Sequence, residues 1–329
     1  MSVVSITYNH EAYIRDALDG FLAQQTDFPF EVIIADDAST DRTPAILREY
    51  AERHPAVIRP ILRPENVGIT ANLTEALTAA RGQYLALCEG DDYWTDPLKL
   101  SKQVAFMDRH PETSVCFHPV RTTWDDGRVD DSEFPPASWR KDLSVDGLLK
   151  NNFIQTNSVV YRRLDRYDDI PPDALPLDWY LHLRHAMRGD IAMLPETMSV
   201  YRRHAQGVWY DSVADQTKFW MSRGPAQAAL YEAMLDLISG HRRREIRVVH
   251  LMYGLVGEIA KIPGPASHTL LKGIIAKHPR LLRRHVGQRL LTSLALQYQR
   301  AQTARFRFRL NRHRKRDDQA PSGRTPDRQ

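Results

Sequence analysis

Residues 30–43 read FEVIIADDASTDRT, an apolar run rich in β-branched residues that ends in two aspartates and a polar turn. The apolar run predicts a strand at 30–35. The residues after it predict a helix at 43–53, with Asp41 or Thr43 placed to cap its first turn. Because the strand is apolar at nearly every position, we expect both of its faces to be covered, as in a parallel sheet flanked by helices.

The same alternation of strand and helix continues on both sides of this stretch. Further strands are predicted at 2–6, 57–62, 84–88 and 114–118, with helices at 11–25, 71–80 and 97–109. Short apolar strands that alternate with helical patterns predict an α/β fold, with a mostly parallel, Rossmann-like sheet and helices on both faces.

This alternation ends at residue 118. Residues 119–142, rich in Asp, Pro and Trp, predict a loop or a hairpin insertion. After it we expect a helix at 144–150, a strand at 157–162, a helix at 177–188, and a closing pair of strands at 191–194 and 198–201. The rest is a C-terminal helical region, with helices at 214–239, 243–261, 266–277 and 279–312. The tail at 317–329 has nothing to bury and is expected to be disordered.

The composition narrows the class of protein. A chain of 329 residues with 42% hydrophobic and 26% charged residues is typical of a globular protein, and excludes a collagen-like, coiled-coil or wholly disordered one. Cys88 and Cys116 are too few for a disulfide framework, which favours a reducing, cytoplasmic setting. No signal-peptide pattern opens the sequence. The most apolar late stretch, 246–260, contains charged residues and is too short to cross a bilayer.

Charge is distributed unevenly along the chain, although the formal net charge is only +4. Residues 240–316 hold 19 Lys or Arg against two Glu, whereas residues 1–239 are acidic overall. This split predicts different partners for the two parts. One expectation is that the basic helices dock on an anionic surface, such as the inner face of a membrane. The alternative is that their apolar faces pack on the rest of the protein and leave a basic exterior in solvent.

Polar residues follow the predicted strands at their carboxyl ends, where open α/β sheets bind ligands. In chain order these are TYNH at 7–10, Asp36 and Asp37, NVG at 66–68, and EGDD at 89–92. None of these turns is the glycine-rich type that holds phosphate at a helix N-terminus. A crevice lined with carboxylates repels a bare phosphate, whereas a divalent cation held by the carboxylates attracts it. The pattern therefore predicts a metal-assisted phosphate site.

Four stretches resemble the nucleotide-sugar-binding half of the family 2 glycosyltransferases, which have the GT-A fold. They are SITYNHEAYI at 5–14, FEVIIADDASTDRT at 30–43, NVGITAN at 66–72 and EGDDYWTDPLKL at 89–100. The resemblance is close over 1–118 and looser over 119–210. It implies an enzyme that moves a sugar from a nucleoside diphosphate, usually uridine diphosphate, to a hydroxyl acceptor with inversion.

The resemblance also implies a division of the chain. The GT-A domain would cover 1–212, with a nucleotide-sugar-binding half at 1–118 and an acceptor half at 119–212, followed by the basic helical region at 213–316 and the tail at 317–329. Partners implied in this way are a nucleotide-sugar donor and a glycan or lipid-linked acceptor.

Individual residues acquire roles from the same match of motifs. The donor residues would be Thr7, Tyr8, Asn9 and Asp37 at the nucleotide base, Asn66 beside them, and Asp91 at the ribose. Asp92 would hold a divalent metal, Mn²⁺ or Mg²⁺, on the diphosphate. Glu89 stands where many members have the first aspartate of a D-x-D pattern. Asp36 is expected to shape its turn, and His10 and Glu11 to order the first loop.

The acceptor half would supply the base. In LPLDWYLHLRHA at 175–186, Asp178 begins a helix and would take the proton of the acceptor hydroxyl. Asp169 and Asp173, in a proline-rich loop, are the alternative bases. Downstream, in YRRHAQGVW at 201–209, His204 would be a further metal ligand or contact the diphosphate, with Arg202 or Arg203 helping to neutralise the leaving group.

Two other functions fit parts of the pattern. A nucleotidyltransferase also uses an α/β sheet with metal-binding carboxylates, but it needs a basic glycine-rich loop after the first strand, which TYNHE lacks. A non-catalytic protein that binds nucleic acid through its basic region is allowed by charge. It would need a reading module, and none is recognisable, so no nucleic acid is expected.

Overall fold

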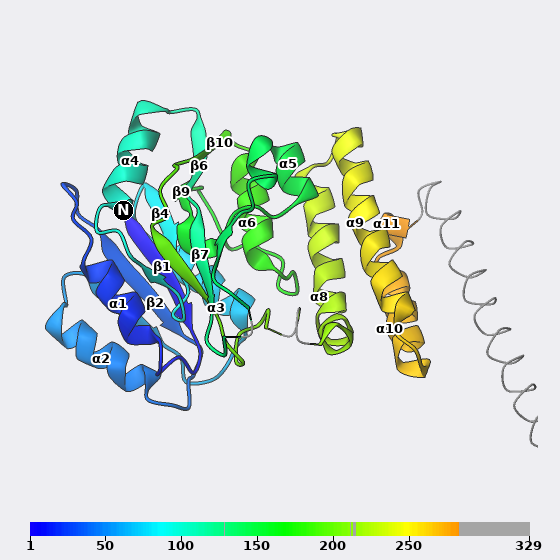
Figure 1. The fold of residues 1–329 in the computed structure, drawn as a ribbon, viewed down its shortest axis with the longest axis horizontal. Coiled ribbons are helices and arrows are strands. Elements are labelled where there is room, and N and C mark those ends of the chain that lie inside the picture. The colour runs from blue at the N-terminus through cyan, green and yellow to red at the C-terminus, as the bar shows by residue number, and fades with distance from the viewer. Residues whose placement is uncertain (128, 211, 213–214, 283–329) are drawn as a thin grey trace, which may run out of the picture. The chain divides into compact units, whose positions relative to one another are not determined.

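The computed structural model describes residues 1–127, 129–210, 212 and 215–282 (Figure 1). The chain forms two compact units, Met1–Leu255 and Val256–Gln329. Of the predicted helix at 279–312, only residues 279–282 are among the described residues. The predicted disordered tail at 317–329 lies wholly outside them.

A seven-stranded sheet forms the centre of the first unit, in the order β10-β6-β9-β4-β1-β2-β3. Its strands are β1 (Ser2–Thr7), β2 (Glu31–Asp36), β3 (Ile58–Leu62), β4 (Tyr84–Leu87), β6 (Thr113–Phe117), β9 (Val160–Arg162) and β10 (Asp190–Met193). Only β9 runs antiparallel to its neighbours, β4 and β6. The predicted mostly parallel α/β sheet is therefore confirmed.

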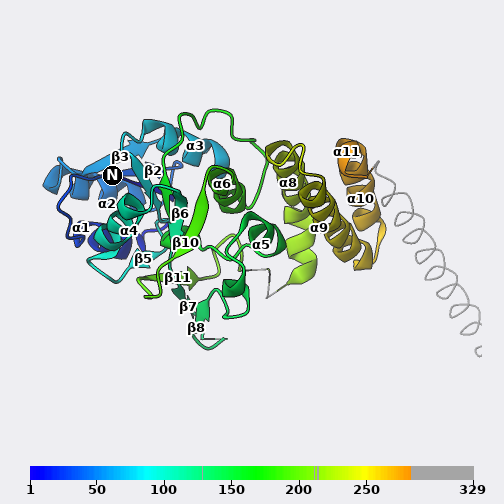
Figure 2. The same cartoon turned by 90° about the horizontal axis from the view of Figure 1, so that it is seen from above.

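Helices cover both faces of this sheet, as predicted. Figure 2 shows α1 (Ile14–Leu22), α2 (Thr43–Arg53) and α4 (Lys99–Arg109) on one face, and α3 (Ile69–Ala79) and α6 (Leu177–Ala186) on the other. The first group shares one apolar core with the sheet, in which Leu18, Phe21 and Met107 are completely buried. The predicted cap of α2 by Asp41 or Thr43 is wrong, because Arg42 occupies the N-cap position and no described side chain caps the helix there. Asp41 Oδ1 instead accepts a hydrogen bond from the Thr43 amide at 2.9 Å, from the residue before the N-cap.

The helix predicted at 11–25 is shorter in the structure, because both of its ends are engaged elsewhere. At the start, the amides of Tyr13 and Ile14 donate to the His10 carbonyl and form a separate turn. At the end, the Gln25 amide donates to the Pro97 carbonyl at 2.8 Å, which directs the chain away from the helix.

A second, four-stranded sheet lies beside the first, in the order β5-β11-β7-β8. Its strands are β5 (Tyr93–Trp94), β7 (Val120–Trp124), β8 (Ser132–Phe134) and β11 (Ser199–Arg203). Because β7 and β8 pair antiparallel, the region at 119–142 contains the hairpin that was one of its two predicted forms.

Both strands predicted at 191–194 and 198–201 are present, as β10 and β11, but they do not pair with each other. β10 pairs with β6 in the first sheet, and β11 lies between β5 and β7 in the second. The Leu194 amide still donates to the Phe117 carbonyl, whereas the Met198 carbonyl already accepts from the Thr95 amide. The two strands are thus bonded to different sheets on either side of a short link, and cannot form a hairpin with each other.

Shorter helices join these layers. They are η1 (Trp139–Lys141), α5 (Val145–Lys150) and η2 (Thr156–Ser158), and the last of these replaces the first half of the strand predicted at 157–162. The C-terminal helices are α8 (Gln216–Leu237), α9 (Arg242–Lys261), α10 (Pro265–Lys277) and α11 (Pro279–Leu282). Within the first unit α8 packs against α6, where the rings of Trp179 and Tyr231 meet edge to face. Among the described helices, none combines the length and the apolarity needed to cross a membrane.

Candidate active site

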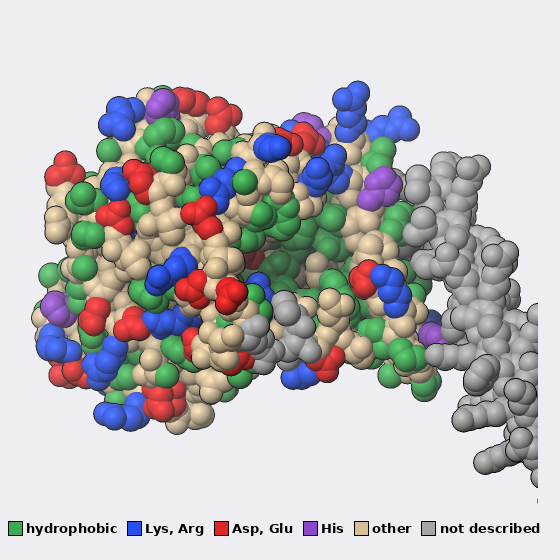
Figure 3. Space-filling view, viewed as in Figure 1, with side chains coloured by type: hydrophobic (Ala, Val, Ile, Leu, Met, Phe, Trp, Pro, Cys, Tyr) green, Lys and Arg blue, Asp and Glu red, His purple; other side chains and the backbone are tan. Residues whose placement is uncertain are grey.

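The carboxyl ends of the central strands open into a cavity of about 210 Å³ within the first unit. Six of the nine residues given a donor, metal or base role in the sequence line it, namely Thr7, Tyr8, Asp37, Asp91, Asp178 and His204, and so do His10, Glu89, Arg202 and Arg203. The structure therefore brings together side chains from both halves of the predicted GT-A domain. Asn9, Asn66 and Asp92 are not on the cavity wall. Figure 3 shows a hollow on this face of the molecule, with hydrophobic side chains on its wall.

Asn9 connects two loops outside the cavity. Its backbone has φ of 56°, in the left-handed region that asparagine tolerates better than most residues. Its Oδ1 accepts a hydrogen bond from the Thr40 amide at 2.8 Å, and its own amide donates to Ser39 Oγ. The same turn is shaped by Asp36, whose Oδ2 accepts from the Ser39 amide at 3.0 Å. Asp36 thus has the turn-forming contacts expected of it.

Asp37 faces the cavity from a fixed position. Its two carboxylate oxygens accept hydrogen bonds from the amides of Val67 at 2.8 Å and Gly68 at 2.9 Å. Asn66 Nδ2 donates to the Asp37 carbonyl, so the NVG segment holds the aspartate from two sides. Gly68 has φ of 86°, a conformation that only glycine adopts without strain. The segment therefore positions Asp37, while the Asn66 side chain itself is not on the cavity wall.

Asp91 is the member of the acidic motif that faces the cavity. Its Oδ2 lies 3.0 Å from His204 Nε2 and 3.7 Å from His10 Nε2. Burial opposes ionisation of Asp91, but the charge of His10 and the hydrogen bond and charge of His204 together hold the pKa of Asp91 below its ordinary value. Asp91 is therefore the ionised carboxylate of this motif.

Asp92 and Glu89 behave differently from Asp91. Asp92 is completely buried, and its Oδ1 accepts a hydrogen bond from the Arg202 amide at 2.9 Å. Burial, followed by the charges of Asp91 and Glu89, raises the pKa of Asp92 well above its usual range. Burial, followed by the charges of Asp91 and Asp178, raises the pKa of Glu89 to about 8. Three carboxyl groups so close together cannot all ionise without a cation between them.

The donor atoms around Asp91 fit a divalent cation. Two overlapping groups have ligand atoms within 4.8 Å of one another, one formed by His10, Asp91 and His204 and the other by Glu89, Asp91 and Asp92. Asp91 Oδ1 and Asp92 Oδ2 are buried and have no hydrogen-bond partner among the described residues. Carboxylate oxygens of this kind suit Mg²⁺ and Mn²⁺. Sequence reasoning gave His10 only a loop-ordering role, although its place directly after the end of β1 was a signal for more.

Asp178 reaches the cavity from the first turn of α6. Its Oδ2 accepts a hydrogen bond from Asn152 Nδ2 at 3.1 Å and lies 3.7 Å from His182 Nε2. The alternative bases are placed elsewhere. Asp169 pairs with Arg184 at 2.8 Å, and neither Asp169 nor Asp173 is on the cavity wall.

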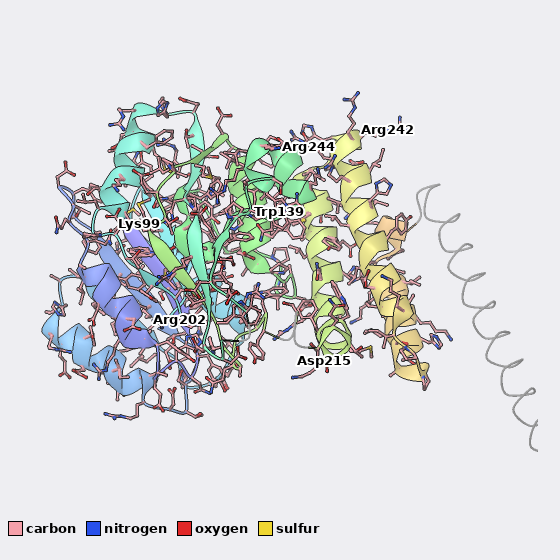
Figure 4. All side chains as sticks on the ribbon, viewed as in Figure 1. Lys99, Trp139, Arg202, Asp215, Arg242 and Arg244 are labelled. Carbon is pink, nitrogen blue, oxygen red and sulfur yellow. The ribbon has the colours of Figure 1, made fainter. Side chains whose placement is uncertain are left out.

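Arg202 and Arg203 line the cavity beside His204. The Arg202 guanidinium is already engaged, because it pairs with Asp16 and lies over the rings of Tyr13 and Tyr93. Figure 4 labels Arg202 on the ribbon of the first unit. Arg203 lies over the Trp124 ring at 5.0 Å and has no carboxylate partner among the described residues. Of the two arginines, Arg203 is therefore the one whose charge is not neutralised by a described carboxylate. Besides Tyr8, the aromatic part of the wall is formed by Tyr201, Trp209 and Tyr210, of which Tyr210 lies outside the motifs identified in the sequence.

Comparison with known proteins places these features in a wider group. A family model described as Glycosyl transferase family 2 matches residues 2–206. The protein Rv1520 of Mycobacterium tuberculosis is 62% identical over 309 residues, which cover 94% of this chain and 86% of that protein. The uncharacterized glycosyltransferase alr2836 of Nostoc is 28% identical over 213 residues, which cover 62% of this chain and 65% of that protein.

Solved structures show the same architecture. PcManGT, a mannosyltransferase of Pyrobaculum calidifontis in complex with GDP-Man and Mn²⁺, aligns with a TM-score of 0.54 at 19% identity, over 90% of this chain and 85% of its own. Residues 1–349 of S. aureus TarS in complex with UDP-GlcNAc align with a TM-score of 0.52 at 20% identity, over 78% of this chain and 80% of that chain. At these identities the likeness shows the fold, which is GT-A.

Proposed function

Because this chain belongs to glycosyl transferase family 2 and is a glycosyltransferase, we propose that it transfers a sugar from a nucleoside diphosphate to a hydroxyl acceptor with inversion. Uridine diphosphate is the proposed leaving group. The observation that carries the proposal is that one cavity joins Asp37, Asp91 and Asp178, which come from three different parts of the chain. The family assignment favours this activity over the nucleotidyltransferase and nucleic-acid-binding alternatives.

The donor end of the cavity lies at β1 and β2. Thr7 Oγ1 is buried and has no hydrogen-bond partner among the described residues, so it can bond to a nucleotide. Tyr8 is 45% exposed and offers an aromatic face to a base. Asp37 is fixed by two backbone amides and can accept from a base N–H with its remaining lone pairs. Asn9 and Asn66 support these residues from outside the cavity.

Asp91 and His204 would hold the divalent metal, with His10 or Asp92 completing the site. This differs from the sequence expectation, in which Asp92 was the metal ligand and Asp91 faced the ribose, because Asp91 is the carboxylate on the cavity wall. When bound there, Mn²⁺ or Mg²⁺ supplies Lewis-acid stabilisation of the negative charge that develops on the departing diphosphate. Arg203 adds a fixed positive charge on the same wall.

Asp178 is the proposed general base. It can take the proton of the acceptor hydroxyl as the oxygen attacks the anomeric carbon of the donor sugar. Asp178 is the one carboxylate that the described residues of the acceptor half, 119–212, place on the cavity wall, which fits the inverting reaction, because that reaction needs one base and no enzyme nucleophile. Leu175, Pro176 and Leu177, together with Val208 and Trp209, form an apolar part of the cavity wall, on which the acceptor would lie.

Nucleotide release tests this proposal directly. UDP-N-acetylglucosamine and GDP-mannose, the donor types bound by TarS and PcManGT, are incubated with the enzyme in Mn²⁺, Mg²⁺ or chelator, and free nucleotide is measured. We expect release to require metal, and Asp178→Asn to lower it by about 10²–10⁴-fold without loss of donor binding. Asp173→Asn is the matched control, since Asp173 is an exposed carboxylate outside the cavity. Equal rates in chelator, or in Asp178→Asn, would refute the assignment.

The acceptor is proposed to be a glycan or a lipid-linked sugar, reached at the cytoplasmic face of an anionic membrane through the basic C-terminal region. The support is the excess of Lys and Arg at 240–316, of which Arg242 and Arg243 are exposed at the start of α9. Because Val248, Val249 and Met252 of α9 are buried, docking there would depend on charge. Co-sedimentation with anionic but not with neutral vesicles is expected. Equal partitioning to both would contradict membrane docking by charge.

A further inference from the structure

A buried histidine lies directly behind the proposed base. His182 is completely buried on α6, one turn after Asp178, and its Nε2 is 3.7 Å from Asp178 Oδ2. This distance is longer than a hydrogen bond, so Nε2 has no hydrogen-bond partner among the described residues. An unpartnered buried ring nitrogen aimed at a cavity carboxylate is costly to the fold, which favours a functional reason for it.

The opposite ring nitrogen decides where the proton lies. His182 Nδ1 is 2.5 Å from the hydroxyl of Tyr161, at the centre of β9. This hydroxyl has no other hydrogen-bond partner among the described residues, so its hydrogen must be donated to Nδ1. Burial, followed by the charge of Asp178, raises the pKa of Tyr161 well above its usual range, so the hydroxyl keeps that hydrogen. A neutral His182 that accepts at Nδ1 carries its own hydrogen on Nε2, facing Asp178.

A charged His182 would leave the Tyr161 hydrogen without an acceptor, but it too carries a hydrogen on Nε2, facing Asp178. Only a neutral ring with its hydrogen on Nδ1 would present a lone pair to Asp178. That arrangement leaves the Tyr161 hydrogen without an acceptor and sets a lone pair against a carboxylate.

The tyrosine is itself held in place. Its ring stacks on His185, with centroids 4.0 Å apart and an interplanar angle of 11°. His185 Nδ1 contacts the Arg162 carbonyl at 3.1 Å, and Nε2 contacts the Tyr167 hydroxyl at 3.3 Å. Burial lowers the pKa of His185 to about 3, so this ring stays neutral and adds no charge behind Tyr161. The sheet and α6 together thus fix the orientation of the His182 ring.

We propose that His182 is a positioning residue for Asp178, whose Nε2–H, fixed by the Tyr161 hydroxyl on the other ring nitrogen, holds that carboxylate ionised and turned into the cavity. The inference rests on the proposed function, in which Asp178 is the base. Hydrogen bonds of this kind are often long without substrate and shorten when the reacting complex forms.

Few other charged groups act on this pair. Glu89, at the end of β4, is the carboxylate whose titration responds to Asp178. Arg203 and His204 face the same cavity from β11 and the residue after it. From the remaining elements that pack on α6, namely α5, α8 and β6, no described side chain forms an ion pair with Asp178 or His182. Within the described residues, His182 is therefore the one cation-capable group within 4.0 Å of the Asp178 carboxylate.

Two substitutions at His182 separate the effect of its N–H group from the effect of its side-chain volume. His182→Met fills similar space without an N–H, whereas His182→Gln places an amide N–H near the position of Nε2. Tyr161→Phe removes the group that fixes the ring hydrogen. Tyr167→Phe is the matched control, because it removes a buried hydroxyl that contacts His185 and does not contact His182.

The first measurement needs no substrate. In wild-type protein with ¹⁵N-labelled histidine, NMR should show hydrogen on Nε2 of His182. The carboxyl carbon of Asp178, assigned with Asp178→Asn, should titrate about one pH unit higher in His182→Met, the scale of one lost hydrogen bond to a carboxylate. His182→Gln should restore part of the shift, and Tyr167→Phe should show none. A wild-type His182 with hydrogen on Nδ1 alone, or an unchanged Asp178 titration in His182→Met, would overturn the proposal.

The second measurement connects the pair to turnover. A base must be ionised to accept a proton, so the acid limb of nucleotide release should move to higher pH by the same amount in His182→Met, with the donor KM unchanged. If Asp178→Asn keeps the wild-type rate, the proposed base is refuted, while the NMR titration still decides whether His182 acts on Asp178. If Asp178→Asn loses activity but the acid limb of His182→Met does not move, the proposal for His182 alone fails.

Discussion

Gly90 gives the sharpest test of how closely the acidic motif is packed. A Cβ atom at this position would lie 2.8 Å from both Ile14 Cδ1 and Thr7 Oγ1, and 2.9 Å from Thr7 Cβ. Carbon atoms pack at about 3.5–4.0 Å, so Gly90→Ala must displace its neighbours by more than half an ångström. Thr7 cannot move cheaply, because it is the last residue of β1 and pairs with Asp36 of β2. We therefore expect Gly90→Ala to lower the free energy of unfolding by about 1–3 kcal/mol, the usual cost of overpacking.

The same displacement should reach the site. The Gly90 amide donates to the Ile6 carbonyl at 2.9 Å, and Gly90 separates Glu89 from Asp91. Metal-dependent nucleotide release should fall along with the stability.

Denaturation in urea, followed by nucleotide-release kinetics, measures both effects of Gly90→Ala. Gly254→Ala is the control, for which we expect the opposite change in the free energy of unfolding, because an added Cβ there has nothing within 4 Å. In the interior of α9 this control should stabilise the protein by about 0.5–1 kcal/mol. If Gly90→Ala leaves the urea midpoint unchanged, Thr7 and Ile14 yield without cost and the reasoning fails.

Three further changes test other parts of the structure. Asp91→Asn should abolish tight Mn²⁺ binding in a titration calorimeter, and retention of wild-type affinity would exclude Asp91 as a ligand. Gly68→Ala should lower both the free energy of unfolding, by about 1–3 kcal/mol, and the affinity for the donor, since its φ of 86° strains any side chain and its amide holds Asp37. Burial lowers the pKa of Lys99 to about 7. Between pH 7 and 10 the unfolded chain therefore binds the Lys99 proton that the folded chain lacks, and the stability conferred at this position rises with pH. Lys99→Met should be most stabilising relative to wild type below pH 7, with an advantage that shrinks toward pH 10, and an advantage independent of pH would contradict this.

Local sequence patterns predicted the elements well and their pairing less well. The apolar runs at 2–6, 30–35 and 84–88 became central strands, because each is apolar on both faces and both faces are covered. The convergence of Asp37 and Asp91 followed from the same logic, since the carboxyl ends of parallel strands share one edge of a sheet. The separation of β10 and β11 could not be predicted in this way, because which sheet edge a strand joins depends on contacts far away in the sequence.

The site shows the same limit. Asp178 was identified from its motif, but the contact of His182 with Tyr161 joins α6 to the centre of the sheet and has no local signal. The sequence likewise contained no indication that the turn after β4 directs Asp91, and not Asp92, toward His204. Spacing in the sequence places both aspartates at the end of a strand and does not distinguish them.

The antiparallel strand β9 has a consequence for how this enzyme can be rebuilt. β4 and β6 belong to the first 118 residues, yet the strand between them is supplied by Val160–Arg162. During synthesis on the ribosome, β6 has no partner connecting it to the sheet until more than forty further residues have emerged. A chimaera with a crossover at residue 118 would also exchange this middle strand. Recombination should therefore keep β9 with residues 1–118 and exchange only the loops on either side of it.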